Sequence, residues 1–325
     1  MRRAIILLNL GGPDSPASIR PFLYNLFSDP AIITLATPVR LPLAWVIAWR
    51  RTRTARAIYA QLGGSSPLLE NTLAQAAALE AILDGDDRCF VAMRYWRPFA
   101  ADAAQAVREW DADELVLLPL YPQFSTTTTA SSLADWRKAA VAAGISLPTR
   151  IIRSYPEAPG FVAALAKQIA PYLDRRPGAR LLFSAHGLPL RIVAKGDPYP
   201  QEIERTARAV VHALARPGLD WRICYQSRVG PLEWLGPSVD QELHRAGEDR
   251  VPVVVAPISF VSEHSETLVE LDRDYRHAAE SCGVPGYERV PTVGTNPKFI
   301  AALAELVGNA DAEAERIAAL IEHDR

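Results

Sequence analysis

The chain contains little cysteine. Its 325 residues include three, Cys89, Cys224 and Cys282, which are odd in number and far apart. This usage predicts neither a disulfide framework nor a metal site of the CxxC type. Since each cysteine lies in or beside an apolar segment, we expect reduced, buried thiols in a cytosolic protein.

No segment has the composition of a secretory leader or a membrane-spanning helix. The N-terminal MRRAIILLNLGG lacks the length and the small-residue cleavage site of a signal peptide, and we interpret it as the first strand. Residues 31–56, AIITLATPVRLPLAWVIAWRRTRTAR, are interrupted by two prolines and Arg40, short of the ~20 continuous apolar residues that a span needs. Their tryptophans and terminal arginines fit either a helix lying in a bilayer interface or a helix that caps a pocket, and composition leaves both open.

An excess of charge is also absent. The formal net charge is −2, which gives no electrostatic reason to expect a nucleic-acid partner. The chain holds no GxGxxG motif, and GGSSPL at residues 63–68 lacks the spacing and the lysine of a phosphate-binding loop. We therefore predict no nucleotide site there.

Short apolar runs alternate with helical segments along the chain. Continuous apolar runs are typical of parallel strands covered on both faces, and segments such as 71–83 and 101–110 show helical spacing. Four runs precede the SYPEAPGF turn and four follow it: RAIILLNLG, CFVAMRYW, ELVLLPLYPQ, TRIIRSYP, then RLLFSAHG, WRICYQSR, VPVVVAPISF and YERVPTV. The pattern predicts an α/β protein with two similar Rossmann-like, doubly wound domains, each with a central four-stranded parallel sheet. We place them at 1–153 and 154–296, followed by a C-terminal helix over 297–325 that packs back on the first domain.

Polar side chains follow these runs where the strands are expected to end. His186 directly follows RLLFSA and precedes Gly187, so we expect it on a tight turn at a strand tip. Other exits carry Arg94 and Tyr95, Tyr121 and Gln123, Gln226 to Arg228, and Ser262 to Glu266. Ligands of open parallel sheets bind beyond the carboxyl ends of the strands, which makes these exits the expected site. Histidine, with an ordinary pKa of ~6.5, suits proton transfer, although a lone histidine is more often structural.

A dense acidic segment follows the run VPVVVAPISF. If a helix begins near Ser262, then Glu266, Glu270 and Asp274 recur every four residues along one side, with His264 near the start. In a regular α-helix this row drifts around the axis, and a local π-type widening would straighten it.

Two functions of the acidic row stay open. Carboxylate and imidazole are suitable ligands for Mg²⁺, Mn²⁺, Fe²⁺ or Zn²⁺, so the row fits a path for a divalent metal. The alternative is a solvated face in which the acids pair with Arg273 and Arg276. The loop CYQSRVGPLEWLGPS carries Trp234, which fits either a packing anchor or a flat cover over an aromatic substrate.

Several long blocks together resemble the signature blocks of ferrochelatase, the terminal enzyme of haem synthesis. They run from Asn9 to about Ile300: LNLGGPDSPASIRPFLYNLFSDPAII, GGSSPL, MRYWRPF, LLPLYPQFSTTTTASS, FSAHGLPLRIVAKGDPYPQEI, CYQSRVGPLEWLGPS and PISFVSEHSETLVELD. The resemblance implies insertion of Fe²⁺ into a porphyrin, with release of two pyrrole protons, in a cleft between two Rossmann-like domains.

The resemblance also implies roles for residues at matching positions. His186 and Glu266 match the opposed catalytic histidine and glutamate of the family. His264 is the neighbouring family histidine, and Glu270 and Asp274 extend the acidic row as a route for iron or protons, so all five are candidate metal ligands. The candidate porphyrin-binding residues are Arg51, Tyr59, Ser66, Arg94, Tyr95, Tyr121 and Trp234.

The expected substrates are protoporphyrin IX and Fe²⁺. The apolar lip at about 31–49 favours protoporphyrin over the more polar coproporphyrin III, and it raises the expectation of peripheral membrane contact through residues 31–56. We expect a cytoplasmic protein, peripheral at the inner face of the membrane. A non-catalytic haem or metal carrier with the same two-lobed fold is the alternative from a different class.

The resemblance also bears on cofactors and on oligomeric state. Some ferrochelatases hold a [2Fe–2S] cluster through four cysteines, and three cysteines cannot supply four thiolates. We expect no cluster and no other permanently bound cofactor. The short C-terminus favours a monomer.

Overall fold

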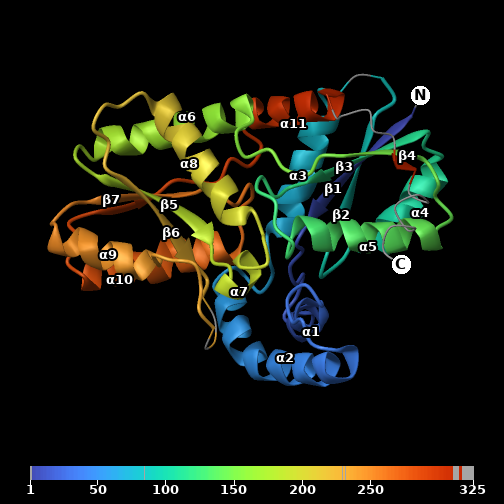
Figure 1. The fold of residues 1–325 in the computed structure, drawn as a ribbon, viewed down its shortest axis with the longest axis horizontal. Coiled ribbons are helices and arrows are strands. Elements are labelled where there is room, and N and C mark those ends of the chain that lie inside the picture. The colour runs from blue at the N-terminus through green and yellow to red at the C-terminus, as the bar shows by residue number, and fades with distance from the viewer. Residues whose placement is uncertain (1, 84, 229, 231, 310–314, 317–325) are drawn as a thin grey trace. The chain divides into compact units, whose positions relative to one another are not determined.

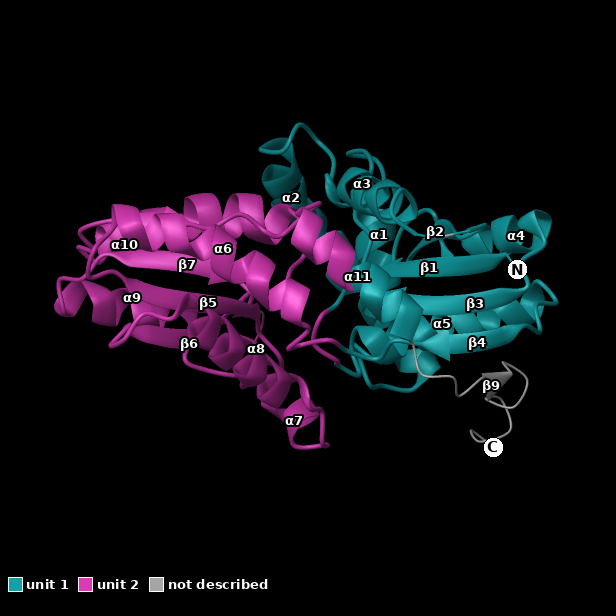
Figure 2. Ribbon diagram, turned by 90° about the horizontal axis from the view of Figure 1, so that it is seen from above, with its two compact units in different colours: residues 1–121, 125–154, 303–325 teal, residues 122–124, 155–302 magenta. Residues whose placement is uncertain are grey.

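The computed structural model describes residues 2–83, 85–228, 230, 232–309 and 315–316. The chain forms two compact units, the first of residues 1–121, 125–154 and 303–325 and the second of residues 122–124 and 155–302 (Figure 2). Each unit has its own sheet with helices packed on it (Figure 1).

The first unit has the strand order β2-β1-β3-β4-β9. Its parallel strands are β1 (Arg3–Asn9), β2 (Arg88–Met93), β3 (Glu114–Pro119) and β4 (Pro148–Ile151). These are the four predicted apolar runs, and β1 is buried from Ala4 to Leu8 because helices leave neither face of a parallel sheet open. A two-residue strand, β9 (Glu315–Arg316), adds an antiparallel edge beside β4 that the sequence pattern did not predict.

The helices of the first unit are α1 (Ile19–Ser28), α2 (Thr37–Ala60), α3 (Leu68–Glu80), α4 (Ala100–Trp110) and α5 (Thr129–Ala142). Side chains of α4 and α5, Trp136 among them, form one core with β1, β2 and β3. α1 and α2 pack on each other around Phe22 and Tyr95. α2 begins with proline in its first turn, where the missing N–H costs nothing, and tolerates a second, Pro42, further in.

The second unit has the strand order β6-β5-β7-β8, all parallel. Its strands are β5 (Arg180–His186), β6 (Trp221–Gln226), β7 (Val253–Pro257) and β8 (Tyr287–Arg289). The order repeats that of β2-β1-β3-β4, so the two units are similar, as predicted. In such sheets the order reverses at the central strands, which here are β5 and β7, and the space beyond their carboxyl ends is the usual ligand position.

The helices of the second unit are α6 (Pro159–Arg175), α7 (Leu190–Val193), α8 (Tyr199–Leu214), α9 (Val239–Glu248), the π-helix η1 (Glu266–Asp274) and α10 (Tyr275–Ser281). Figure 1 shows α6 and α8 on one side of the sheet and α9 and α10 on the other. Leu271 of η1 and Tyr275 of α10 share a core with α9, β5, β6 and β7, which fixes η1 against the sheet.

The last described helix, α11 (Pro297–Asn309), starts in the second unit, and its residues 303–309 are grouped with the first unit. The sequence pattern predicted helix as far as the C-terminus, but residues 310–314 and 317–325 lie outside the described residues. In the part of the chain that is described, no helix is both long enough and apolar enough to cross a membrane.

Candidate active site

The ends of three strands in the second unit bring the predicted catalytic residues together. β5 ends at His186, its neighbour β6 ends at Gln226, and β7 leads through a short loop to His264 and η1. Nε2 of His186 lies 3.6 Å from Oε2 of Glu266, and Nε2 of His264 lies 3.7 Å from the same oxygen. One carboxylate oxygen is therefore shared between two imidazoles.

Backbone carbonyls fix the tautomers of both histidines. Nδ1 of His186 is 2.6 Å from the carbonyl oxygen of Gly187, and Nδ1 of His264 is 3.1 Å from that of Ser262. A carbonyl only accepts, so each Nδ1 carries the hydrogen and donates it. In the neutral histidine each Nε2 is then an unprotonated base that faces Glu266. The ring of Phe260 packs against both imidazoles, with ring centroids 6.4 Å from that of His186 and 4.6 Å from that of His264.

The two histidines differ in exposure. The side chain of His186 is 41% exposed and that of His264 is 10% exposed. Burial of His264 favours its neutral form, but the Glu266 carboxylate outweighs burial and raises the pKa of His264. His186 is the one of the pair that a substrate can reach most readily.

The charge of Glu266 is set by the same pair. Burial alone would raise its pKa, but the charge of His186, and then the hydrogen bond and charge of His264, outweigh burial and lower the pKa of Glu266 to about 2. The carboxylate is therefore ionised at neutral pH and lies next to both imidazoles.

Glu270 has a different environment. Its carboxylate accepts from the backbone N–H of Ser227 at 2.8 Å, the hydroxyl of Ser227 at 2.6 Å, Nε2 of Gln226 at 3.1 Å and the hydroxyl of Tyr275 at 3.1 Å. Burial and the negative charge of Glu266 outweigh these bonds and raise the pKa of Glu270. The site therefore pairs an ionised carboxylate with a second that takes up a proton more readily.

The acidic segment is π-helical, which is the form that would straighten its row of carboxylates. The helix begins at Glu266 rather than near Ser262, because Thr267 exchanges hydrogen bonds with the backbone of His264 and holds the preceding residues in a turn. Asp274, the last predicted member of the row, is exposed at the end of η1. Among the described residues, no three His, Cys, Asp or Glu side chains are grouped closely enough to hold a metal ion.

The cation that meets the acidic segment is one that the sequence pattern did not indicate. Arg289, at the end of β8, forms ion pairs with Glu263 and Asp272, whereas Arg276 donates to the carbonyls of Asp272 and Tyr287. The Arg289 charge outweighs burial and holds the pKa of Glu263 below its ordinary value. Glu263 and Asp272 are thus paired with a buried arginine rather than with Arg273 and Arg276 on a solvated face, while Glu266 and Glu270 face the histidines and Ser227.

Trp234 lies beside the turn that follows His186. Its Cε3 atom is 3.2 Å from the position that a Cβ atom on Gly187 would occupy, and its backbone pairs with Pro189. The indole N–H is buried and has no acceptor in the described part of the chain. The tryptophan therefore packs over the turn that follows His186.

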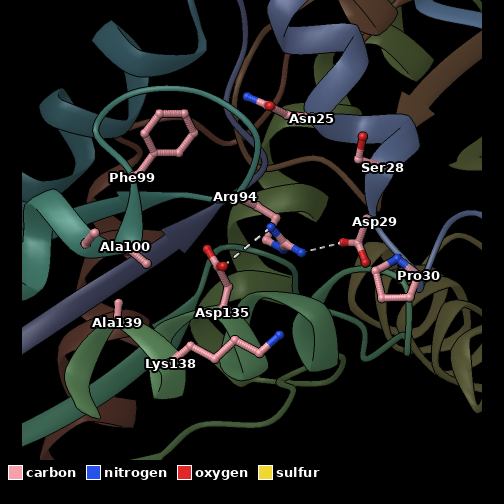
Figure 3. A pocket seen from close by; sticks show the side chains of 11 residues that line it. Asn25, Ser28, Asp29, Pro30, Arg94, Phe99, Ala100, Asp135, Lys138 and Ala139 are labelled. Carbon is pink, nitrogen blue, oxygen red and sulfur yellow. Dashed lines mark hydrogen bonds and ion pairs between the residues drawn. The ribbon is translucent and has the colours of Figure 1, made fainter. Parts of the chain in front are cut away.

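Arg94 and Tyr95 belong to a polar network at the carboxyl end of β2 in the first unit. Tyr95 is fully buried and donates its hydroxyl hydrogen to Asp29, at 2.7 Å, and Arg94 donates to the same oxygen of Asp29 at 2.7 Å. Ser131 also donates to Asp29, and Asp135 lies 3.6 Å from Arg94. A pocket of about 560 Å³ opens beside this network (Figure 3). Because Tyr95 is buried on Asp29, its side chain is not accessible to a ligand in this structure, even beside the pocket.

The other predicted porphyrin-binding residues of the first unit lie on α2, on the loop that precedes α3, and at the end of β3. The guanidinium of Arg51 stacks 5.8 Å from the ring of Phe27, and Tyr59 is mostly buried on α2. Ser66 binds the carbonyl of Pro13 through its backbone N–H at 2.7 Å. Tyr121 lies 3.4 Å from the hydroxyl of Ser132, and burial raises its pKa.

Comparison with known proteins decides the family. A model of the ferrochelatase family matches residues 2–311. The chain belongs to the ferrochelatase family. It is 51% identical over 316 residues to the ferrochelatase of Wolbachia sp. subsp. Drosophila simulans (strain wRi), a match that covers 95% of this chain and 99% of that protein. It is 52% identical over 313 residues to the ferrochelatase of Phenylobacterium zucineum (strain HLK1), over 94% of this chain and 90% of that one. Metal insertion into a porphyrin in haem synthesis, a lyase reaction, is therefore its activity.

Solved structures support the fold of this ferrochelatase. SirB from Bacillus subtilis with Fe³⁺ superposes with a TM-score of 0.57 at 11% identity, over 95% of this chain and 96% of that one. The sirohydrochlorin chelatase SirB from Bacillus subtilis subspecies spizizenii in complex with cobalt gives 0.54 at 12% identity, over 96% and 100%. At such low identity the likeness concerns the fold alone, and it confirms the prediction of two Rossmann-like halves.

Proposed function

We propose that this ferrochelatase inserts Fe²⁺ into protoporphyrin IX, with His186 and Glu266 as its catalytic pair. The observation that carries the proposal is the Glu266 carboxylate shared between the Nε2 atoms of His186 and His264. Insertion replaces two pyrrole N–H protons with one Fe²⁺, so two protons must leave the macrocycle. Bases that are held next to an ionised carboxylate can take them at neutral pH.

We assign the first proton to Nε2 of His186. In the neutral tautomer that the carbonyl of Gly187 fixes, Nε2 carries no hydrogen, and the side chain of His186 is more exposed than that of His264. Glu266 stabilises the imidazolium that forms. Glu270, with its raised pKa, is the next group along η1 and takes this proton onward, which returns His186 to its neutral form to accept the second pyrrole proton.

The same groups would receive the metal. Imidazole and carboxylate are suitable ligands for Fe²⁺. Our candidates for its contacts are His186, Glu266, His264, Glu270 and the exposed Asp274, and the row along η1 offers a route from solvent inward. Because Fe²⁺ is a substrate, these contacts need only be transient.

For the porphyrin we propose contacts to Arg51, Tyr59, Ser66, Arg94, Tyr121 and Trp234. Tyr95 is left out because its side chain is buried on Asp29 and serves that network. The ion pairs of Arg94 with Asp29 and Asp135 offset its charge, so it is the weakest of the candidates for a carboxylate of the substrate.

The surface of α2 supports contact with a membrane. Trp45 and Trp49 are 52% and 59% exposed, and Arg50, Arg53 and Arg56 follow as exposed cations. Other large exposed apolar side chains nearby are Leu35, Val39, Leu41, Leu43 and Val46. Apolar and basic side chains in this combination bind the interface of an anionic bilayer. We propose a cytoplasmic monomer that attaches to the inner face of the membrane, with no [2Fe–2S] cluster or other resident cofactor.

The test is anaerobic Fe²⁺ insertion into protoporphyrin IX and, in parallel, coproporphyrin III, followed by porphyrin absorbance. His186→Ala and Glu266→Gln should each lower kcat on protoporphyrin at least a hundredfold while porphyrin still binds. His277→Ala and Glu280→Gln remove an exposed pair of the same chemistry from α10 and should leave kcat unchanged. Faster turnover of coproporphyrin III would correct the substrate, and full activity of both site variants would overturn the catalytic assignment.

A further inference from the structure

Arg289 binds both ends of the segment that carries the catalytic acids. Its side chain is 7% exposed. It donates from Nη1 to Oε1 of Glu263 at 2.6 Å, and from Nε to Oδ1 of Asp272 at 2.9 Å, with a second, shorter bond from Nη2 to Oδ2 of Asp272. The guanidinium is therefore bidentate on one carboxylate and bonded to a second.

The two partners of Arg289 bracket the site in sequence. Glu263 directly precedes His264, and Asp272 lies within η1, two residues after Glu270. His264, Glu266 and Glu270 all lie between these two anchors. A change in the distance between the anchors must therefore change the helix on which the site is built.

The π-helix is the element that requires such an anchor. π-helical segments are rare and usually short, and they occur at functional sites, since regular α-helix is the more stable form. Here η1 extends from Glu266 to Asp274, and Tyr287 of β8 donates its hydroxyl hydrogen to the carbonyl oxygen of Leu271 at 2.6 Å. Strand β8 thus binds η1 at two points, of which the Arg289 contact is the charged one.

Loss of Arg289 would leave Glu263 and Asp272 without this guanidinium, close to a segment that already carries Glu266 and Glu270. Like charges repel, and a part-buried carboxylate that loses its charged partner is destabilised in its position. Both effects would release the turn before His264 and allow η1 to relax.

We propose that Arg289 is a positioning residue for metal insertion: by holding Glu263 and Asp272 it keeps η1 in its π-helical form and so sets the positions of His264, Glu266 and Glu270. The inference rests on the proposed catalytic role of Glu266. Arg289 itself touches no reacting atom and acts only through the two carboxylates.

The experiment compares Arg289→Gln with Arg180→Gln. Arg180 is 8% exposed and also bridges two carboxylates, Asp220 and Asp249, but it stands at the first residue of β5, a seven-residue strand whose last residue is His186. At a rise of ~3.3 Å per residue the two ends of that strand are about 20 Å apart. Arg180→Gln therefore matches the loss of an ion-pair bridge without touching the site.

Both variants should lower the Tm by a similar amount. Arg289→Gln should in addition lower kcat for Fe²⁺ insertion at least tenfold at a temperature where it is fully folded, with the KM for porphyrin within twofold. Arg180→Gln should keep the kcat of the unaltered enzyme. Amide hydrogen exchange in peptides covering 263–275 should rise in Arg289→Gln and stay unchanged in Arg180→Gln. Arg289→Lys, which keeps the charge but loses the bidentate geometry, should recover part of kcat.

A kcat for Arg289→Gln within twofold of the unaltered enzyme, with unchanged exchange across 263–275, would overturn the inference. If Arg289→Gln does not fold, Glu263→Gln and Asp272→Asn replace it, since each removes one anchor and should give the same pattern more weakly. Failure of the proposed function is distinguishable, because Glu266→Gln would then remain active.

Discussion

Ser227 donates both its backbone N–H, at 2.8 Å, and its hydroxyl hydrogen, at 2.6 Å, to the carboxylate of Glu270. It does so with φ at 59°, a left-handed conformation that costs a residue with a Cβ free energy. The strained backbone aims two donors at one acid directly after β6 ends. We interpret this arrangement as one that holds Glu270 in position next to Glu266. Burial and the charge of Glu266 still keep the pKa of Glu270 raised.

We expect Ser227→Ala to shift the pH dependence of the enzyme. The Ser227 bonds lower the pKa of Glu270, against burial and Glu266, so loss of the hydroxyl raises that pKa further. Glu270 then stays protonated to a higher pH. The acid limb of the kcat/KM profile should move to higher pH, with a loss of about tenfold on that limb, the equivalent of ~1.4 kcal/mol, and little loss above it.

The control for this change is Ser281→Ala, which removes a serine hydroxyl bonded to a carbonyl on the exposed face of α10. Its pH profile should match that of the unaltered enzyme. A uniform loss across the whole profile in Ser227→Ala would contradict the role in setting the pKa of Glu270 and would indicate a packing effect instead.

The turn after His186 accepts no side chain. A Cβ atom on Gly187 would lie 2.8 Å from the carbonyl oxygen of Gln226 and 3.2 Å from Cε3 of Trp234. The backbone oxygen has no room to move because it accepts the N–H of Gly187 between β5 and β6. We expect Gly187→Ala to cost about 1–3 kcal/mol of unfolding free energy and to lower kcat at least tenfold. Urea unfolding and the insertion assay measure the two effects.

Gly308→Ala is the matched control for Gly187→Ala. A Cβ atom there meets nothing within 4 Å, and the position is helical and exposed. Since alanine is the better helix former, this variant should be equally or more stable, by ~0.5–1 kcal/mol, with unchanged activity. Unchanged kcat in Gly187→Ala would show that the turn adapts and that the Trp234 contact is not needed.

The sequence pattern was sufficient for the fold because the fold depends on local signals, whereas the pairing of His186 with Glu266 came from the family resemblance. Continuous apolar runs mark parallel strands, and the positions where they end place His186 and the acidic segment beyond β5 and β7. The four-residue spacing of Glu266 and Glu270 also indicated that a π-type widening would align them, which is the form observed.

The parts that sequence reasoning missed depend on distance in the chain or on backbone conformation. Arg289 is 26 residues from Glu263, and only the packing of β8 brings its guanidinium to that acid. The left-handed φ of Ser227 could not be predicted from the sequence, because serine rarely adopts that conformation. Tyr95 follows a strand, as a ligand-binding residue would, yet its side chain turns inward. It donates to Asp29, which is bonded to Ser131 and Arg94 in one buried network.

The exposed tryptophans of α2 should decide membrane binding. We expect the double variant Trp45→Ser, Trp49→Ser to lower partitioning to phosphatidylglycerol-containing vesicles at least tenfold, since burial of each large apolar side chain contributes ~1.5–3 kcal/mol. Sedimentation with the vesicles measures the bound fraction. The control is Leu73→Ser, Ile82→Ser, which removes two comparably exposed apolar side chains from α3 and the turn after it. Equal losses in both double variants would contradict a specific role for α2.

Asp29 should link the stability of the first unit to pH. Burial opposes its ionisation, but hydrogen bonds from Ser131 and the Ala31 backbone, the charge of Arg94 and the Tyr95 hydroxyl outweigh burial and lower the pKa of Asp29. A carboxyl with a lowered pKa in the folded state contributes stability above its ordinary pKa of ~3.9, and that contribution is lost as the pH falls from there through the folded-state pKa.

We therefore expect Asp29→Asn to cost about 1–3 kcal/mol of unfolding free energy at pH 7, and the difference from the unaltered protein to shrink below about pH 4. Urea unfolding between pH 3 and pH 7 measures both. Asp111→Asn, which removes an exposed ion pair with Arg2, is the control and should cost less than ~1 kcal/mol at every pH. The difference in unfolding free energy between Asp29→Asn and the unaltered protein could instead stay constant down to pH 3. That result would contradict the lowered pKa, because it would mean that the protonated carboxyl of Asp29 serves the network as well as the carboxylate.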